Sequence, residues 1–474
     1  MKLHYRPADG FVGDVIPFYH GRAYHLFYLK APLPPAPRFL TPWAHIVSQD
    51  LIHWEELPVA IAPGGEGAPD VGGCWTGSVI ASDDAFHMFY TGHAPNDPQL
   101  PQTVCHAQSF DLIHWEKDPR NPILTASPQW YEHTDWRDPF VFRHPTEDCY
   151  WMLITARVKD APTPRAGCVA LAKSSDLDTW EIHPPLWTPY IVHAPECTDV
   201  FPLEGRWYLV FSTTETRYRI GLSPAGPWGA PAVESFDGPR LYAAKTLSDA
   251  ENRRLLFGWV PTREGEKDGG AWEWGGNLAT PREIVFAEKD GTLTVGCPRE
   301  IVQGVGSPSV GPGEITGFVA RLGRWKASGD VLVGESRDGF GYSVFPEIGG
   351  DLAVDVTITM DGAPTRAGLL IRAGEKLQRG YVLMLEPLYQ RLTLRPWQSW
   401  GDAESFVDRP LRVVRGEPIS FHVMVQGSII EVLAGGHCCL TCRLYDHTAG
   451  HLALFVENGL AEFSGFSAWG LNPE

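Results

Sequence analysis

Short stretches in which apolar and polar residues alternate recur through the first part of the chain. Residues 23–29, 86–90 and 207–211 are examples, and each has the length of a strand and is rich in aromatic side chains. No segment keeps the apolar spacing of three and four residues over the length of an ordinary helix. The pattern therefore predicts an all-β fold, in which strands pack on one another rather than on helices.

A repeated unit predicts how these strands are arranged. The unit Ser-x-Asp-Leu-x-x-Trp-Glu begins at Ser48, Ser109 and Ser174, and a weaker copy begins at Ser223. A strand group that recurs at a nearly constant spacing is typical of propeller blades, and residues 1–300 have room for about five of them. In each unit we expect the Asp to cap a turn and the Trp to pack between neighbouring blades, with no part in catalysis.

The character of the chain changes near residue 300. Residues 304–313 are rich in Gly, Pro and Ser, as in a linker, and the repeat is absent after them. Residues 352–360, 368–372 and 428–433 then alternate as strands separated by turns. We therefore predict two domains: a five-bladed β-propeller at residues 1–300 and a C-terminal β-sandwich at residues 301–474.

Charge and the N-terminal residues narrow the choice of partner and location. The net charge of −18 repels phosphate backbones and anionic lipid surfaces, which argues against nucleic acid and membrane partners. A neutral or cationic ligand fits this field better. The first residues lack the apolar core of a signal peptide, and the sequence contains no run of about eighteen apolar residues. We expect a cytoplasmic location, while the oligomeric state stays open.

The cysteines predict neither disulfides nor a metal site. There are nine of them, an odd number without a regular framework, in a chain large enough to fold without staples. Residues 437–442 bring one His and three Cys together, but a structural zinc site needs four ligands, and no second Cys/His pair has the right spacing. We expect reduced thiols, no metal and no cofactor.

Three acids beside aromatic strands are the candidates for catalysis. Asp14 lies in Gly-Asp-Val-Ile-Pro-Phe, Asp138 in Trp-Arg-Asp-Pro-Phe, and Glu196 in Ala-Pro-Glu-Cys-Thr-Asp. Hydrolysis of a glycosidic bond needs one carboxylate to attack or to direct water, and one carboxylic acid to protonate the leaving oxygen. Any one of these acids alone is also typical of a turn or a cap. Three of them converging at the axis of a propeller predict a glycosidase.

Further blocks follow in one order along the chain. They are Tyr-His-Leu-Phe-Tyr at 24–28, Gly-Cys-Trp-Thr-Gly-Ser at 73–78, Trp-Arg-Asp-Pro at 136–139, Glu-Cys at 196–197, Tyr-Ala-Ala-Lys-Thr at 242–246, Phe-Gly-Trp at 257–259 and Leu-Ala-Thr-Pro-Arg-Glu at 278–283. Together with the segment at 48–58 they resemble glycoside hydrolase family 32, the invertase, inulinase and levanase family. The resemblance covers nearly the whole chain. It implies a five-bladed propeller followed by a β-sandwich, and a retaining mechanism acting on fructofuranosides.

The resemblance also implies roles for single residues. Asp14 corresponds to the nucleophile, Asp138 to the transition-state stabiliser and Glu196 to the general acid/base, acting through a covalent glycosyl-enzyme intermediate. Arg137 is expected to hold sugar hydroxyls. Trp75 is expected to offer a ring face to the sugar, although a Trp in this fold is also commonly a core residue. The residues expected to bind substrate are Arg137, Trp75, Ser78, Cys197, Asp199, Trp43 and Trp274.

The chain departs from the family around the predicted nucleophile. The family surrounds this acid with Trp-Met-Asn-Asp-Pro-Asn-Gly, whereas no Asn flanks Asp14, and Leu29 stands where the family has a sugar-contacting Gln. A site that lacks these hydrogen bonds discriminates differently among sugars, so the identity of the −1 sugar is open.

The leading hypothesis is a retaining glycosidase acting on a small fructofuranoside or a related furanoside. Three alternatives stay open from the sequence. The first is a fructosyltransferase or difructose-anhydride-type transglycosylase, because a hydroxyl can intercept the covalent intermediate. The second is a catalytically silent carbohydrate-binding protein, and the third is an inverting or phosphorolytic glycosidase.

Overall fold

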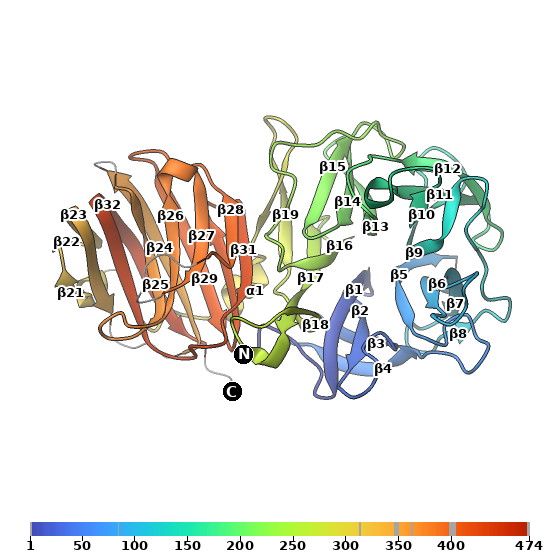
Figure 1. The fold of residues 1–474 in the computed structure, drawn as a ribbon, viewed down its shortest axis with the longest axis horizontal. Coiled ribbons are helices and arrows are strands. Elements are labelled where there is room, and N and C mark those ends of the chain that lie inside the picture. Colours follow the sequence, from blue (N-terminus) through green and yellow to red (C-terminus); the bar gives the residue numbers. More distant parts are fainter. Residues whose placement is uncertain are drawn as a thin grey trace.

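The chain is almost entirely β, as predicted. The computed structural model describes residues 2–83, 85–311, 314–345, 350–361, 364–397 and 404–471. Strands β1 to β20 form one part and strands β21 to β32 form the other, side by side (Figure 1). The helices of the described residues are single turns or little more: η1 (Thr163–Arg165), η2 (Glu264–Glu266), α1 (Arg299–Gly304), η3 (Glu314–Gly317) and η4 (Pro387–Tyr389). None of them is long and apolar enough to span a membrane.

The N-terminal strands form successive antiparallel groups. They are β1 (Gly10–His20), β2 (Ala23–Pro32), β3 (Trp43–Ser48) and β4 (Glu55–Ile61); β5 (Cys74–Ser82), β6 (Ala85–His93), β7 (Gln102–Ser109) and β8 (Glu116–Lys117); β9 (Tyr131–Arg143), β10 (Tyr150–Val158), β11 (Gly167–Ser174) and β12 (Glu181–Trp187); β13 (Glu196–Leu203), β14 (Arg206–Ser212) and β15 (Thr216–Gly221); and β16 (Tyr242–Ser248), β17 (Arg254–Arg263), β18 (Trp272–Leu278), β19 (Arg282–Phe286) and β20 (Leu293–Gly296).

The first strands of these groups contact one another in a closed ring. Strand β1 contacts β5, β5 contacts β9, β9 contacts β13, β13 contacts β16, and β16 contacts β1 again. Strand β18 then pairs with β1, at Gly276 and Val12, and joins the last group to the first in one nine-stranded sheet. Residues far apart in sequence therefore meet at the centre of the ring, which is the arrangement expected of propeller blades.

The repeated units have the structural role predicted for them. The Asp111 carboxylate accepts the backbone N–H groups of Ile113 and His114 and so caps the turn between β7 and β8. The Trp115 ring lies edge-on to Phe27 of the preceding group, with 5.8 Å between ring centroids. Trp180 packs in the same way on Phe89 at 5.4 Å, and none of these rings lines the central cavity described below.

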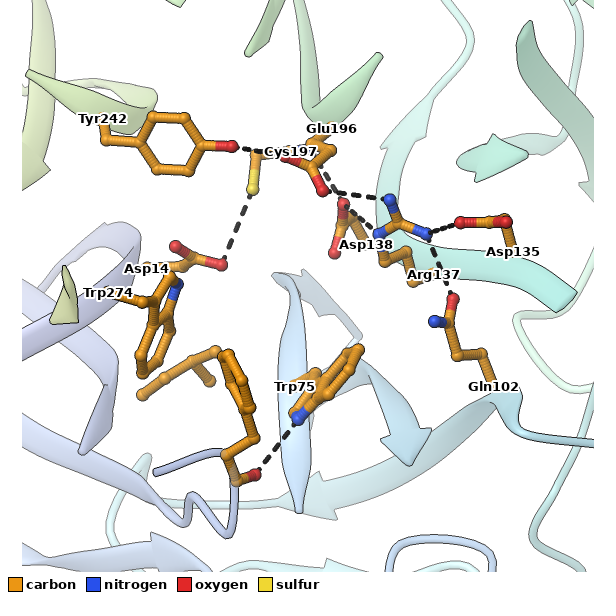
Figure 2. Close-up of a pocket in the computed structure, with 12 residues that line it drawn as sticks. Asp14, Trp75, Gln102, Asp135, Arg137, Asp138, Glu196, Cys197, Tyr242 and Trp274 are labelled. Atoms are coloured by element: carbon orange, nitrogen blue, oxygen red, sulfur yellow. Dashed lines mark hydrogen bonds and ion pairs between the residues drawn. The ribbon is translucent and has the colours of Figure 1, made fainter. Parts of the chain in front are cut away.

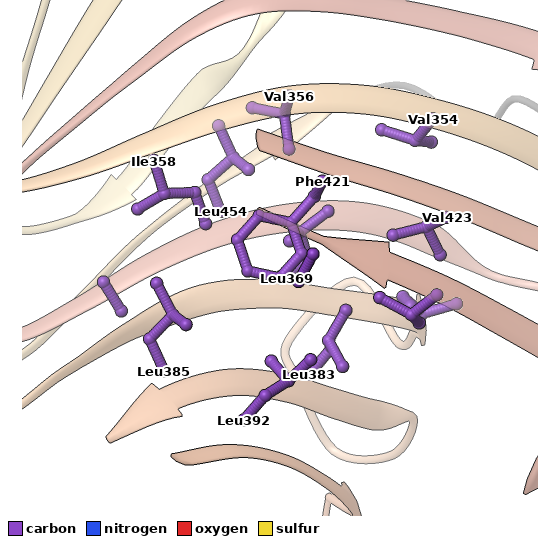
Figure 3. Close-up of a cluster of buried hydrophobic side chains, with 14 of the residues drawn as sticks. Val354, Val356, Ile358, Leu369, Leu383, Leu385, Leu392, Phe421, Val423 and Leu454 are labelled. Carbon is purple, nitrogen blue, oxygen red and sulfur yellow. The ribbon is translucent and has the colours of Figure 1, made fainter. Parts of the chain in front are cut away.

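The C-terminal strands form one twelve-stranded sheet that folds over on itself like a sandwich. They are β21 (Val319–Leu322), β22 (Arg324–Ser328), β23 (Val331–Phe345), β24 (Leu352–Asp361), β25 (Arg366–Ala373), β26 (Tyr381–Glu386), β27 (Arg391–Pro396), β28 (Val407–Pro410), β29 (Pro418–Gln426), β30 (Ile429–Ala434), β31 (Cys438–Arg443) and β32 (His451–Gly470). The terminal strands β28 and β31 contact each other. Alternate side chains such as Val354, Val356 and Ile358 fill the interior with Leu369, Leu383 and Phe421 (Figure 3).

The structure also locates the cysteines and the predicted linker. All nine cysteines are free thiols, and the run of one His and three Cys at residues 437–442, in which no metal site was expected, belongs mostly to β31. Of the predicted linker, residues 312 and 313 lie outside the described residues. Its described part begins at the end of α1 and is held by a bridge between Val310 and Ala468 of β32.

Buried charges join the two parts of the molecule. The Glu431 carboxylate of β30 accepts hydrogen bonds from the Thr280 backbone N–H and from Arg282 of the N-terminal part, at 3.2 and 3.0 Å. Although burial opposes it, Arg282 and His4 hold the pKa of Glu431 far below its usual range. Beside them, the Asp237 carboxylate accepts the Thr441 backbone N–H at 2.9 Å. The sheet face made by β30 and β31 thus supports the last N-terminal strands.

Candidate active site

A cavity of about 330 Å³ opens at the centre of the ring of strands (Figure 2). Its lining comes from every N-terminal group of strands, since residues of β1, β5, β9, β13 and β16 all take part. The lining residues are Asp14, Leu29, Phe39, Trp75, Gln102, Asp135, Arg137, Asp138, Glu196, Cys197, Tyr242 and Trp274.

A β-bulge in the first strand of each group directs these side chains. In each case the first strand has one residue more than its neighbour: the pairing shifts between Val12 and Val15 in β1, between Trp75 and Gly77 in β5, between Arg137 and Phe140 in β9, between Glu196 and Asp199 in β13, and between Tyr242 and Lys245 in β16. Asp138, Cys197 and Ala243 take positive φ at these bulges, at 57°, 53° and 48°. A bulge bends its strand and re-aims a side chain, so five equivalent bulges point their residues at one centre.

The Asp14 carboxylate is held by groups from two other strands. Thr76 donates its hydroxyl to Oδ2 at 2.7 Å, and Trp259 donates its indole N–H to Oδ1 at 3.0 Å. Burial raises the pKa of Asp14 to about 6, and the nearby charges of Asp138 and Glu196 also raise it, while the two hydrogen bonds oppose the shift. Asp14 therefore changes its protonation state near neutral pH.

The Asp138 carboxylate is buried and anchored through a single oxygen. Its Oδ2 accepts the Thr155 hydroxyl at 3.0 Å and the Cys197 backbone N–H at 2.9 Å. Burial raises the pKa of Asp138, and Arg137 opposes this shift. Because both bonds go to Oδ2, Oδ1 is left for a ligand in the cavity.

The Glu196 carboxyl lies between a cation and a phenol. Arg137 donates to Oε1 at 2.9 Å, and Tyr242 makes a short hydrogen bond to Oε2. Burial and the neighbouring Glu196 charge raise the pKa of the Tyr242 hydroxyl well above its usual range, so it remains a donor. Arg137 is itself bonded to Asp135 and to the Gln102 side-chain oxygen, which holds it between three acids.

The structure brings together most of the residues predicted to form the site. Asp14, Asp138, Glu196, Arg137, Trp75, Cys197 and Trp274 all line the cavity. The Cys197 Sγ lies 3.8 Å from Asp14 Oδ2, and burial raises the pKa of its thiol far above the usual range.

Three residues predicted to bind substrate, Ser78, Asp199 and Trp43, are not among the residues that line the cavity. Ser78 accepts the Val141 backbone N–H, and Asp199 accepts the backbone N–H and the hydroxyl of Thr246. Trp43 is fully buried and donates its indole N–H to the Trp75 carbonyl. Ser78 and Asp199 are just as buried, so these three polar groups satisfy the framework and do not face a ligand.

The sequence did not single out five of the lining residues as ligand contacts: Leu29, Phe39, Gln102, Asp135 and Tyr242. Tyr242 had a detectable signal, because it opens the Tyr-Ala-Ala-Lys-Thr block at 242–246 that resembles the family. In the structure it directly precedes the bulge of its strand, as Glu196 and Arg137 do in theirs. Phe39 and Gln102 lie in a loop and at the start of β7, and only the fold brings them to the cavity.

The geometry provides acids for proton transfer and for nucleophilic attack. Among the described residues, no cluster of His, Cys, Asp and Glu could hold a metal ion. Three carboxyl groups facing one cavity are typical of a glycoside hydrolase. Residues 4–296 match the N-terminal domain of glycosyl hydrolases family 32, and residues 330–470 match the C-terminal domain of the same family. The chain belongs to this family and is a glycoside hydrolase.

Relatives and solved structures agree with this assignment. The chain is 29% identical to the sucrose-6-phosphate hydrolase of Escherichia coli, over 61% of this chain and 63% of that protein. It is 26% identical to the sucrose-6-phosphate hydrolase of Zymomonas mobilis, over 99% of this chain and 91% of that protein. The fold is similar to that of fructan 1-exohydrolase IIa from Cichorium intybus, with a TM-score of 0.73, 22% identity and coverage of 98% of this chain and 96% of that one.

Proposed function

We propose that the chain hydrolyses small fructofuranosides, or closely related furanosides, with retention of configuration. The observation that carries this proposal is that carboxyl groups from β1, β9 and β13 face one cavity, each held in place by hydrogen bonds from protein donors. Gathering acids in the interior lowers the stability of the fold, because burial opposes their charge. Such a cost is typical of catalytic sites. This speaks against a site that only binds sugar.

The proposed roles follow from what each acid contacts. The ionised Asp14 attacks the anomeric carbon, while Glu196 protonates the leaving oxygen; water activated by Glu196 then releases the sugar from the covalent intermediate. Arg137 and Tyr242 orient the Glu196 carboxyl. The free oxygen of Asp138 accepts sugar hydroxyls and favours the positive charge of the transition state.

The charges in the cavity favour an unphosphorylated substrate. Among the described residues that line it, Arg137 is the one cation, and it is already bonded to Asp135 and Glu196. A phosphate needs free cationic donors, whereas four carboxyl groups here repel an anion. The proposed ligand is therefore a small neutral carbohydrate, although two of the relatives named above are sucrose-6-phosphate hydrolases.

Three further proposals concern architecture and location. The closed ring of five first strands supports a five-bladed propeller. The lengths of the two family matches support domains at residues 1–300 and 301–474. We propose a cytoplasmic location, as the sequence suggested.

The test is a hydrolysis assay on sucrose, fructo-oligosaccharides, difructose anhydrides and aryl furanosides. We expect release of the furanose sugar, reduced about a thousandfold or more in Asp14→Ala and in Glu196→Gln, because each removes a group that acts on the reacting bond. Asp148→Ala removes an exposed acid outside the cavity and serves as the matched control. Turnover that survives both cavity substitutions would overturn the assignment of the acids, and absence of any turnover would overturn the function.

A further inference from the structure

One wall of the cavity is apolar, in contrast to the acidic side. It is made by Leu29, Phe39, Trp75 and Trp274. Its aromatic rings contact one another in a row. The ring centroids of Trp274 and Phe39 are 5.3 Å apart, and those of Phe39 and Trp75 are 5.9 Å apart. On its other side Trp274 meets Trp259, the residue that donates to Asp14, at 5.6 Å. The apolar wall thus begins directly beside the proposed nucleophile.

Local backbone geometry places Trp274 in this wall. Strand β18 pairs Glu273 with Thr262 and Gly276 with Pro261, so Trp274 and Gly275 form a bulge of extra residues. Gly275 adopts φ of 90°, a conformation that other residues rarely take. Since β18 also pairs with β1, this bulge turns the Trp274 side chain over the backbone next to Asp14.

Gly13 is required for this position of the indole. A Cβ on residue 13 would lie 2.3 Å from Cη2 and 2.5 Å from Cζ2 of Trp274, far inside van der Waals contact. The indole therefore fills the space that any side chain before Asp14 would occupy. The position of the Trp274 ring therefore depends on the absence of a side chain at Gly13.

The wall has almost no capacity to hydrogen-bond a sugar. Leu29 and Phe39 have no polar side-chain atoms, and the Trp75 indole N–H is bonded to the Phe39 carbonyl at 3.2 Å. The Trp274 side chain lines the cavity (Figure 2), and its indole N–H makes no hydrogen bond with a described residue. The side chains of the wall thus offer one donor and no acceptor. A sugar hydroxyl placed there cannot donate to them, whereas a C–H group loses no hydrogen bond and an ether oxygen has no donor proton to leave unpaired.

We propose that this wall makes the enzyme accept furanosides whose glycone has a ring hydroxyl replaced, either by hydrogen or by an ether oxygen, nearly as well as the parent sugar or better. The inference rests on the proposed function, in which Asp14 attacks one face of the glycone and the leaving oxygen departs toward Glu196. Residues 13, 29 and 274 lie on the nucleophile's side, so they contact the glycone rather than the leaving group. Leu29 and Trp274 are then the residues that determine specificity.

The ratio of kcat/KM values for the parent sugar and an analogue without one hydroxyl distinguishes this site from one that hydrogen-bonds every hydroxyl. A site built to bond a hydroxyl rejects the analogue that lacks it by about 10⁴-fold, whereas an apolar wall discriminates by about 10–200-fold. We therefore expect at least one monodeoxy or mono-O-methyl analogue of a fructofuranoside to be hydrolysed within about tenfold of the parent kcat/KM, or faster.

The experiment compares kcat/KM for sucrose and for the monodeoxy and mono-O-methyl analogues of its fructosyl unit. The variants are Leu29→Gln and the double variant Gly13→Asn/Trp274→Ala, each of which puts an amide where the wall is apolar. Both should lower the ratio of analogue to parent kcat/KM by about tenfold or more. Leu222→Gln makes the same exchange at an exposed position away from the cavity and should leave the ratio unchanged.

Each outcome decides the matter. If the wild type hydrolyses sucrose but every analogue reacts more than about tenfold more slowly, the wall does not act as proposed, while the proposed function stands. An unchanged ratio in both variants leads to the same conclusion. If no furanoside is hydrolysed in an Asp14-dependent way, the proposed function fails and this inference fails with it. Because Leu29→Gln changes one side chain at the surface of the cavity, it keeps the test valid even if the double variant does not fold.

Discussion

At the scale of single residues, burial of Asp14, the proposed nucleophile, lowers the stability of the fold when its carboxyl is ionised. Its pKa is about 6 in the folded protein against an ordinary value of 3.8. Between these two values the folded state binds more protons than the unfolded state, so stability falls as pH rises through this window. Below it both states are protonated and the penalty is absent; above it the penalty is complete.

Asp14→Asn should therefore stabilise the protein at neutral pH and have no such effect in acid. We expect a gain on the order of 1–3 kcal/mol near pH 7 that disappears near pH 4, since about 1.4 kcal/mol corresponds to each unit of pKa. The amide can keep both partners, accepting from Trp259 and donating to the Thr76 hydroxyl. Urea denaturation across this pH range measures the difference, with Asp148→Asn as the exposed control. Equal stability of the wild type and Asp14→Asn at every pH would contradict the argument.

At the scale of elements, the turn after the third strand is the repeated device of the N-terminal part. The leucine of each unit, Leu51, Leu112 or Leu177, has a positive φ of 65–66° and is buried. A leucine in this conformation is strained, but its burial and the capping Asp offset the strain. The device is a matter of stability and lies away from the cavity.

Asp111→Ala should accordingly destabilise the protein without changing catalysis. Its carboxylate caps two backbone N–H groups, and loss of such a cap costs about 1 kcal/mol. The same loss is expected for Asp50→Ala and Asp176→Ala, whose turns have the same bonds. Urea denaturation and kcat/KM on the same samples check this. A folded variant with kcat/KM reduced more than about tenfold would show that the unit reaches the site after all.

At the scale of elements, some features of the fold could be predicted from the sequence and others could not. The period-two strands, the repeat and the three acids were enough to predict an all-β fold and a cavity in which Asp14, Asp138 and Glu196 meet. The bulges were not predictable, because an extra residue in a strand depends on its partner strand. For that reason the sequence did not show that Ser78, beyond the bulge in β5, lies outside the cavity lining, or that Tyr242, just before its bulge, belongs to it. Gly13 was noted only as a lost Asn, since the indole that fills its space comes from β18.

At the scale of the whole molecule, the two parts are fastened by a buried ion pair. Glu431 and Arg282 are 2% and 6% exposed in their side chains and lie 3.0 Å apart, with Asp237 at 3.6 Å from the same guanidinium. Removal of one partner leaves a buried charge without its counter-charge.

Glu431→Ala should therefore destabilise the protein by about 3–5 kcal/mol. The double variant Glu431→Leu/Arg282→Met should recover part of this loss, because apolar residues of similar volume do not leave a charge unpaired. Thermal and urea denaturation of the full chain measure both. If Glu431→Ala lies within about 0.5 kcal/mol of the wild type, the pair does not fasten the two parts.

Closure of the ring by β18 sets the order in which the active site is completed on the ribosome. Asp14 is among the first residues to be made, but its hydrogen-bond donor Trp259 follows 245 residues later. At about 5–20 residues per second, the proposed nucleophile waits roughly 12–50 seconds for that partner. Trp274 arrives later still, and β18 carries it to Gly13. A nascent chain is therefore inactive until its last blade emerges.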